Sequence, residues 1–203
     1  MLVVISYPTA VADEANSINA LFDEGLKILH LRKPGIAKAD LCLILNAIRP
    51  YYRYRIALHQ HHEIAAEFGI NRLHFTESGR KTTSYDKLSQ LKQLYNNKLS
   101  TSIHQLDDYV NLPSCFDYTF FGPVFNSISK QGYISTLPEN FKFPLLFNQP
   151  DPIALGGIDA TNIQKALDMQ FSGVAALGII WKKPGESIQQ FKTLQKAWMQ
   201  TGR

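Results

Sequence analysis

Residues 2–31 read LVVISYPTAVADEANSINALFDEGLKILHL and hold two short apolar runs, at 2–5 and 27–31, separated by a segment of helical period. Between the two runs, Ala15, Ile18, Leu21 and Phe22 recur at intervals of three and four residues, which is typical of a helix with one buried face. The order predicts a β-strand, a helix beginning near Asp13, and a second strand parallel to the first.

The same unit repeats along the chain. Further apolar runs, which we expect to be strands, occupy residues 55–58, 72–75, 99–103, 117–121, 152–155 and 173–177. Segments of helical period follow most of these runs. Their apolar positions are Leu41, Ile44, Leu45 and Ile48 before Pro50; Ile64, Ala65 and Phe68 before a left-handed cap at Gly69; Leu88, Leu91 and Tyr95; Ile163, Ala166 and Leu167 after an N-cap at Asp159; and Ile188, Phe191, Leu194 and Trp198.

Eight strand–helix units predict an α/β fold, a (β/α)₈ barrel formed by residues 1–203 as one domain. The sixth unit is irregular, because four prolines between residues 138 and 152 leave room for only a short or missing sixth helix. An open doubly wound sheet is the alternative architecture. It would place a glycine-rich nucleotide loop after the first strand, but residues 6–10 read SYPTA and contain no glycine. The barrel is therefore preferred.

Composition excludes several classes of protein. The chain has 203 residues, 45% of them hydrophobic, which is enough for one sizeable core. Its 21 basic and 17 acidic residues are dispersed, which argues against a dedicated nucleic-acid-binding arm, and the mild positive charge fits a site for small anionic ligands at least as well as a surface for polyanions. Cys42 and Cys115 form no disulfide framework, and no apolar run approaches the ~20 residues needed to cross a membrane. We expect a soluble cytoplasmic protein without a signal peptide, and the sequence leaves open whether it forms homo-oligomers.

Polar residues follow the predicted strands at their carboxyl ends, where barrels of this class carry their functional groups. Arg32 lies two residues after His30, so both side chains share one face of the second strand. Glycines after the last two strands let backbone N–H groups approach a phosphate. We expect a site for two anionic groups among His30, Arg32, Lys33, His59, Thr76, Glu77, Ser100, Ser102, His104, Lys130, Gly156, Gly157 and Gly178.

Several histidines and aromatic residues have simpler interpretations. The run 59–62 reads HQHH, but neighbouring residues at a helix start diverge, so we expect solvated side chains rather than a metal site. His74 lies in the middle of a predicted strand and is expected to be a hydrogen-bonded histidine inside the barrel. His104 is either functional or an orienting residue. Phe120, Phe121 and Phe125 are expected to pack in the core and against a loop.

Six segments resemble the thiamine phosphate synthase and thiazole tautomerase superfamily, and the resemblance covers nearly the whole chain. They are residues 29–33 (LHLRK), 102–104 (SIH), 117–125 (DYTFFGPVF), 127–130 (SISK), 154–158 (ALGGI) and 173–175 (GVA). The resemblance implies a transferase that couples an aminopyrimidine methyl diphosphate with a thiazole phosphate, giving thiamine phosphate and pyrophosphate. In that family the diphosphate leaves first, and the thiazole nitrogen attacks the resulting pyrimidine cation.

The resemblance also implies roles for individual residues. Arg32 and Lys130 would be catalytic, since they would hold the leaving diphosphate, and Ser102 would bind near it. The other implied substrate-binding residues are His30, Lys33, His59, Ser127, Ser129, Gly156, Gly157 and Gly178. Ser127 and Ser129 stand where the family usually has two threonines, and they keep the hydroxyl groups.

The departures from the family pattern concern the metal. The synthases use Mg²⁺, which the resemblance implies here too, but their Asn-Asp pair after the third strand reads His59-Gln60 in this chain, and of residues 77–80 only Glu77 is acidic. The metal ligands are therefore unassigned. The tautomerase branch isomerises a thiazole carboxylate phosphate without a cation, but this chain has Pro123 where that branch has a histidine. His30 or His104 could then carry the proton. A non-catalytic protein that binds thiazole phosphate or thiamine is the third interpretation.

Overall fold

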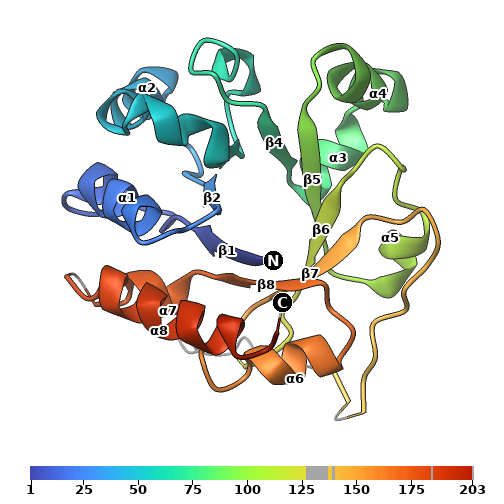
Figure 1. Ribbon diagram of the computed structural model, residues 1–203. Helices are drawn as coiled ribbons and strands as arrows, with labels where there is room; N and C mark the ends of the chain where they lie inside the picture. Colours follow the sequence, from blue (N-terminus) through green and yellow to red (C-terminus); the bar gives the residue numbers. More distant parts are fainter. Residues whose placement is uncertain (127–136, 139, 184, 203) are drawn as a thin grey trace.

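The computed structural model describes residues 1–126, 137–138, 140–183 and 185–202. Eight parallel strands pair in chain order, and β8 pairs with β1 to close a barrel with helices around it (Figure 1). The predicted (β/α)₈ fold is confirmed. The strands are β1 (Leu2–Ile5), β2 (Ile28–Leu31), β3 (Ile56–Leu58), β4 (Arg72–Phe75), β5 (Lys98–Ile103), β6 (Tyr118–Phe121), β7 (Asp151–Leu155) and β8 (Gly173–Ala176).

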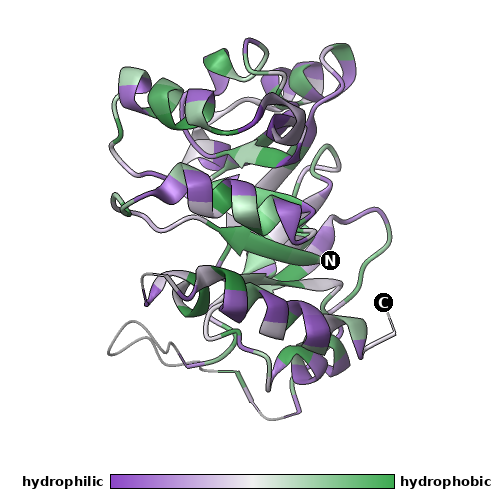
Figure 2. Ribbon diagram, turned by 60° about the vertical axis from the view of Figure 1, so that its left-hand side comes forward, coloured by the Kyte–Doolittle hydropathy of each residue, from purple (hydrophilic) through white to green (hydrophobic). Residues whose placement is uncertain are grey.

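Successive side chains along each strand point alternately into the barrel and toward the helices, so the apolar side chains form two cores. One set fills the barrel interior and includes Val3, Ile5, Phe120 and Ile153. The larger set lies between the strands and the helices. Figure 2 shows hydrophobic strands enclosed by helices whose colour alternates between hydrophobic and hydrophilic residues. Each fully buried aliphatic or aromatic side chain contributes about 1.5–3 kcal/mol to folding. The helices are therefore held mainly by their apolar faces.

Helices follow most strands, although some differ from the prediction. The third unit has only a short 3-10 turn, η2 (His62–Ile64), where a helix was expected, while the fourth has two helices, α3 (Glu77–Thr82) and α4 (Tyr85–Leu94). Gly69 has the expected left-handed backbone, with φ +67°. The remaining elements are α1 (Glu14–Asp23), α2 (Lys38–Ala47), η1 (Pro50–Arg55), α5 (Leu106–Val110), α6 (Ile163–Asp168), α7 (Gly178–Trp181) and α8 (Ser187–Met199).

The segment between β6 and β7 contains no helix among its described residues, in keeping with its prolines. The prediction of an N-cap at Asp159 is wrong, because Asn162 is the N-cap residue of α6. Asp159 instead accepts hydrogen bonds from the backbone N–H and the hydroxyl of Thr161 at 2.8 and 2.6 Å. Cys42 and Cys115 are both free. In the described part of the chain, no helix has the length and apolar character that crossing a membrane requires.

The seam between β1 and β8 depends on Gly173, and replacing it with alanine is expected to lower the free energy of unfolding by about 3 kcal/mol. A Cβ atom there would lie 2.3 Å from the carbonyl oxygen of Met1, and neither backbone can move without breaking the seam. Gly79→Ala is the matched control, because its nearest atom is the Thr76 hydroxyl at 3.2 Å. Urea unfolding of both variants checks this, and equal unfolding midpoints would contradict it.

Candidate functional site

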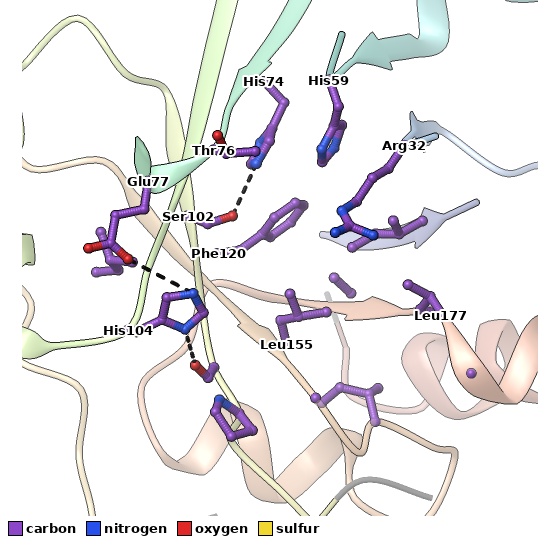
Figure 3. Close-up of a pocket in the computed structure, with 18 of the residues that line it drawn as sticks. Arg32, His59, His74, Thr76, Glu77, Ser102, His104, Phe120, Leu155 and Leu177 are labelled. Carbon is purple, nitrogen blue, oxygen red and sulfur yellow. Dashed lines mark hydrogen bonds and ion pairs between the residues drawn. The ribbon is translucent and has the colours of Figure 1, made fainter. Parts of the chain in front are cut away.

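A cavity of about 720 Å³ opens at the carboxyl ends of the strands. Its wall carries a mixture of charged, polar and apolar side chains, as Figure 3 shows. Arg32, His59, Ser102 and the glycines after β7 and β8 line it, as the sequence predicts. Three predicted site residues, Ser127, Ser129 and Lys130, lie outside the described residues, so their roles remain predictions.

Arg32 follows β2 and supplies positive charge to the cavity. Its backbone N–H donates to the Ser6 hydroxyl at 2.9 Å, and that hydroxyl donates back to the Arg32 carbonyl at 3.1 Å. This double contact holds the end of β2 against the end of β1. Within the described residues the Arg32 guanidinium has no ion-pair partner, and Figure 3 shows it pointing into the cavity. It is therefore available to an anionic ligand, and a guanidinium can bind phosphate oxygens in pairs.

Lys33 does not join Arg32, and its prediction as a substrate-binding residue is wrong. Because neighbouring residues at a strand end point in opposite directions, its side chain turns away from the cavity. The ammonium group pairs with Glu14 at 2.6 Å and donates to the carbonyl oxygens of Tyr7 and Thr9 at 2.8 and 2.7 Å. With only 4% of its surface exposed, Lys33 ties the loop after β1 to α1.

His59 and His74 form part of the cavity floor. Their rings are stacked with centroids 3.9 Å apart, and both point toward Phe120 in Figure 3. His74 hydrogen-bonds the Ser100 hydroxyl through Nδ1 at 2.9 Å and the Ser102 hydroxyl through Nε2 at 3.0 Å. The expectation that His74 is a hydrogen-bonded histidine inside the barrel is confirmed, and it also lines the cavity.

His30 lies below this floor and does not line the cavity, which corrects its prediction as a substrate-binding residue. Its side chain is fully buried inside the barrel, with Nδ1 2.9 Å from Nε2 of His59 and Nε2 2.7 Å from the Tyr118 hydroxyl. The period-two alternation does put His30 and Arg32 on the same face. His30 lies two residues before Arg32 and therefore deeper inside the barrel, so the barrel encloses its ring.

Burial keeps the imidazole rings of His30, His59 and His74 neutral. It lowers the pKa of His30 to about 3, with a further contribution from the positive charge of Arg72. Burial also lowers the pKa values of His59 and His74 well below the usual value, and the neighbouring rings and Arg32 add to this effect. At neutral pH the floor of the cavity therefore offers uncharged imidazoles, each of which can donate one hydrogen bond and accept another.

The loops after β7 and β8 form the opposite side of the cavity. Gly156 and Gly157 have φ values of +99° and +66°, and a Cβ atom at Gly157 would lie 2.4 Å from the carbonyl oxygen of Asn126. Asn162 braces this turn, since its side-chain amide donates to the Gly157 carbonyl at 2.8 Å. Gly178 begins the short helix α7 directly after β8. This arrangement suits close approach of a phosphate group to the backbone.

The residues present at the expected metal position do not fit Mg²⁺. The side-chain oxygen of Gln60 accepts the backbone N–H of Lys33 at 3.0 Å, so it is already used. Glu77 pairs with Lys81, whose hydrogen bond lowers the pKa of that carboxyl group, and lies 4.0 Å from Nε2 of His104. Among the described residues that line the cavity, Glu77 is the only carboxylate. Mg²⁺ prefers octahedral coordination by several oxygens, which this set lacks.

His104 belongs to the same wall. Its Nδ1 lies 2.8 Å from the carbonyl oxygen of Gly122, which orients the ring, while the side chain remains 55% exposed to the cavity mouth. The neighbouring Gly122-Pro123 peptide bond is cis. Sequence reasoning missed the inward hydrogen bonds of Tyr118 and the lining role of Lys81. The sequence did contain a signal for Tyr118, because polar residues at alternate positions of an apolar strand indicate side chains that point into the barrel.

Comparisons with known proteins agree with the barrel fold. Residues 1–180 match the family model described as thiamine monophosphate synthase. Thiamine phosphate pyrophosphorylase from Bacteroides thetaiotaomicron is 25% identical with a TM-score of 0.73, covering 98% of this chain and 97% of that one. The enzyme of the same name from Pyrococcus furiosus shares the fold at 14% identity, with a TM-score of 0.73 and 98% and 95% coverage. Among curated proteins, none matches.

Proposed function

Because the chain belongs to the thiamine monophosphate synthase family, we propose that it joins an aminopyrimidine methyl diphosphate to a thiazole phosphate. Thiamine phosphate and pyrophosphate would be the products. The observation that carries this proposal is that Arg32 and the glycine turns after β7 and β8 line one cavity. A guanidinium without a described ion-pair partner suits the diphosphate, and the backbone N–H groups near Gly157 suit the single phosphate.

In this proposal the residues act mainly by stabilising charge. Arg32 binds the diphosphate and neutralises the negative charge that grows as the carbon–oxygen bond breaks. The backbone near Gly156, Gly157 and Gly178 holds the thiazole phosphate so that its nitrogen reaches the cationic carbon. The neutral rings of His59 and His74 add no positive charge beneath the pyrimidine cation. Apolar neighbours such as Leu155 and Leu177 exclude water that would otherwise capture it.

A metal-free isomerase of a thiazole carboxylate phosphate is the second candidate. It is favoured by two features of the cavity, namely that Glu77 is the one carboxylate among its described lining residues and that the imidazoles of His59 and His74 are neutral. An isomerase needs groups that give and accept protons, which neutral imidazoles can do, and it needs no cation. The same glycine turns would hold the single phosphate of its substrate.

A coupled assay distinguishes the two candidates. Purified protein is mixed with both synthase substrates, with and without Mg²⁺, and thiamine phosphate is followed. We expect product formation, and Mg²⁺ dependence would mean that substrate oxygens supply most of the metal coordination. Absence of product, together with isomerisation of the thiazole carboxylate phosphate, would instead support the second candidate. Binding of thiazole phosphate without either reaction would overturn both and leave a non-catalytic binding protein.

A further inference from the structure

Three histidines from neighbouring strands meet inside the barrel at the floor of the cavity. His30 lies in β2 and His74 in β4, and His59 directly follows the last residue of β3. One ring nitrogen of each residue lies within 4.8 Å of those of the other two. The three residues are 0%, 1% and 9% exposed, in the order given. Within the described part of the chain, no other group of three histidine, cysteine or acidic side chains converges in this way.

Two of the ring nitrogens already have nearly the spacing of metal ligands. Nδ1 of His30 lies 2.9 Å from Nε2 of His59. Two nitrogens bound at about 2.0–2.1 Å to one tetrahedral Zn²⁺ ion are separated by about 3.3 Å. The ring of His74 stacks on that of His59, with centroids 3.9 Å apart and 25° between the planes. It must therefore turn toward the other two rings, until a spacing of up to 4.8 Å becomes about 3.3 Å.

Hydroxyl groups are placed to fix the tautomers that a metal requires. A histidine ligand usually donates its other ring N–H to an oxygen atom, which orients the ring. Nε2 of His30 lies 2.7 Å from the Tyr118 hydroxyl, so the ring can donate there and keep the lone pair of Nδ1. Nδ1 of His74 lies 2.9 Å from the Ser100 hydroxyl, which donates to the Leu73 carbonyl at 3.5 Å. His74 can therefore donate through Nδ1 and keep the lone pair of Nε2.

The hydrogen bonding of the cluster is incomplete without a ligand. Nδ1 of His59 is buried and has no hydrogen-bond partner among the described residues. Burial lowers the pKa values of all three histidines, so each ring is neutral at physiological pH and has one lone pair. When the hydrogen of His59 is on Nδ1 and that of His30 on Nε2, two lone pairs face each other across 2.9 Å. A cation between them would stabilise that arrangement.

We propose that His30, His59 and His74 bind a divalent transition-metal ion of the Zn²⁺ type. Imidazole nitrogen is a common ligand of Zn²⁺, whereas Mg²⁺ requires oxygen ligands, which the three side chains do not supply. Three protein ligands leave one position of a tetrahedron open, as in zinc sites that bind water or substrate. This position lies toward the cavity, since Nε2 of His74 is 3.0 Å from the Ser102 hydroxyl and both residues line the cavity.

The surrounding charge determines what fills the fourth position. Besides burial, the positive charge of Arg32 lowers the pKa values of His59 and His74, and that of Arg72 lowers the pKa of His30. The two arginines would repel a bare divalent ion. An oxyanion as the fourth ligand offsets this repulsion, so the metal and an anion in the cavity should favour each other's binding.

The metal site goes beyond the proposed function and requires neither candidate reaction. A divalent ion at the cavity floor would lie beneath the pyrimidine cation of the proposed coupling and would raise its energy. Zn²⁺ is therefore expected to inhibit that coupling rather than assist it. A test of binding alone keeps the two proposals separate, because zinc binding can fail while coupling activity is present, and the reverse.

The test measures zinc binding by protein that carries no histidine tag. Equilibrium dialysis followed by metal analysis gives the stoichiometry, and competition with a chromophoric chelator gives the affinity. We expect one Zn²⁺ per chain, and His30→Asn, His59→Asn and His74→Asn should each weaken binding by a factor of at least about ten. The matched control is His104→Asn, which removes a cavity histidine outside the cluster, 4.0 Å from Glu77, and should leave the affinity unchanged.

Two further measurements cover variants that fail to fold. Tyr118→Phe keeps the aromatic ring, removes the hydroxyl beside the cluster and should weaken Zn²⁺ binding by a factor of about 10–100. Tyr109→Phe removes another buried hydroxyl, one that donates to the Pro150 carbonyl, and should not weaken it. Co²⁺ bound to the wild type should give the visible absorption of a four-coordinate nitrogen–oxygen site, without the sulfur-to-metal band of a cysteine ligand.

Several outcomes would overturn the proposal. They are a wild type without bound zinc, zinc that is lost in His104→Asn, a Co²⁺ spectrum with the cysteine band, and an affinity unchanged in the folded variants of the cluster. Sulfate, an oxyanion that does not precipitate zinc, should tighten Zn²⁺ binding about threefold or more. Equal affinity with and without sulfate would overturn the fourth position at the cavity.

Discussion

Arg32→Ala is expected to lower kcat/KM of thiamine phosphate formation at least a hundredfold while the protein stays folded. The guanidinium lines the cavity, and no ion-pair partner competes for it within the described part of the chain. Removing one preorganised group that stabilises developing negative charge costs about 3 kcal/mol, which corresponds to this factor. The fold should survive, because the contacts that hold the end of β2 to Ser6 come from the Arg32 backbone.

The matched control is Arg49→Ala. Arg49 is an exposed arginine that pairs with Asp23 at 2.7 Å and does not line the cavity, so its loss should leave kcat/KM unchanged. Arg32→Lys separates charge from geometry, since an ammonium keeps the charge but cannot form the paired hydrogen bonds of a guanidinium. We expect an intermediate rate from this variant. Titration calorimetry with inorganic pyrophosphate should show the tightest binding for the wild type, weaker binding for Arg32→Lys and the weakest for Arg32→Ala. An Arg32→Ala enzyme as fast as its parent would refute the assignment.

The second large effect is on stability, which should fall steeply as the pH drops from 6.5 to 5. Below an unfolded-state pKa of about 6.5, His30, His59 and His74 take up protons when the chain unfolds but remain neutral in the fold. The unfolded state then binds more protons, so the free energy of unfolding increases with pH. This stability is fully present above pH 6.5 and is lost as the pH falls toward the folded-state values, which is about 3 for His30.

The expected slope is about 1.4 kcal/mol per pH unit for each histidine, and about 4 kcal/mol per unit for the three. Urea unfolding at closely spaced pH values measures it. His30→Gln should reduce the slope by about 1.4 kcal/mol per pH unit, and His74→Asn should do the same. His104→Asn, which changes a histidine whose side chain is 55% exposed, serves as the control for replacing a histidine. A slope unaffected by either buried substitution would show that these rings are not the source.

Periodicity along the sequence was sufficient to predict the barrel. The runs that became β1 to β8 are short and apolar, and period-two alternation correctly placed Arg32 toward the barrel axis. The glycines after β7 and β8 were predicted as places where a backbone can approach an anion, and in the structure the Cβ positions of Gly156 and Gly157 face the backbone of residues 123–126. Patterns of this kind depend only on residues two to four positions apart in the chain, so they can be recognised in a single sequence.

Local differences arose where a residue had two competing partners. Asp159 is an acceptable N-cap by residue type, but its side chain bonds Thr161, and Asn162 occupies the N-cap position of α6 without a side-chain capping hydrogen bond. The apolar positions after β3 fit a helix, although only a 3-10 turn forms there. Lys33 follows Arg32 directly and carries the same charge, yet its ammonium is captured by Glu14 and two carbonyl groups. Residue type alone does not say which partner is nearer.

The sequence by itself determined the eight strands, their order and most of the residues that reach the cavity, with His30 and Lys33 as the exceptions. Only the tertiary structure decided how His30 is used, because its hydrogen-bond partners His59 and Tyr118 are 29 and 88 residues away in the chain. Barrel closure brings them together and removes them from water. That burial, which no local pattern encodes, makes the imidazoles neutral and joins them to the cavity floor.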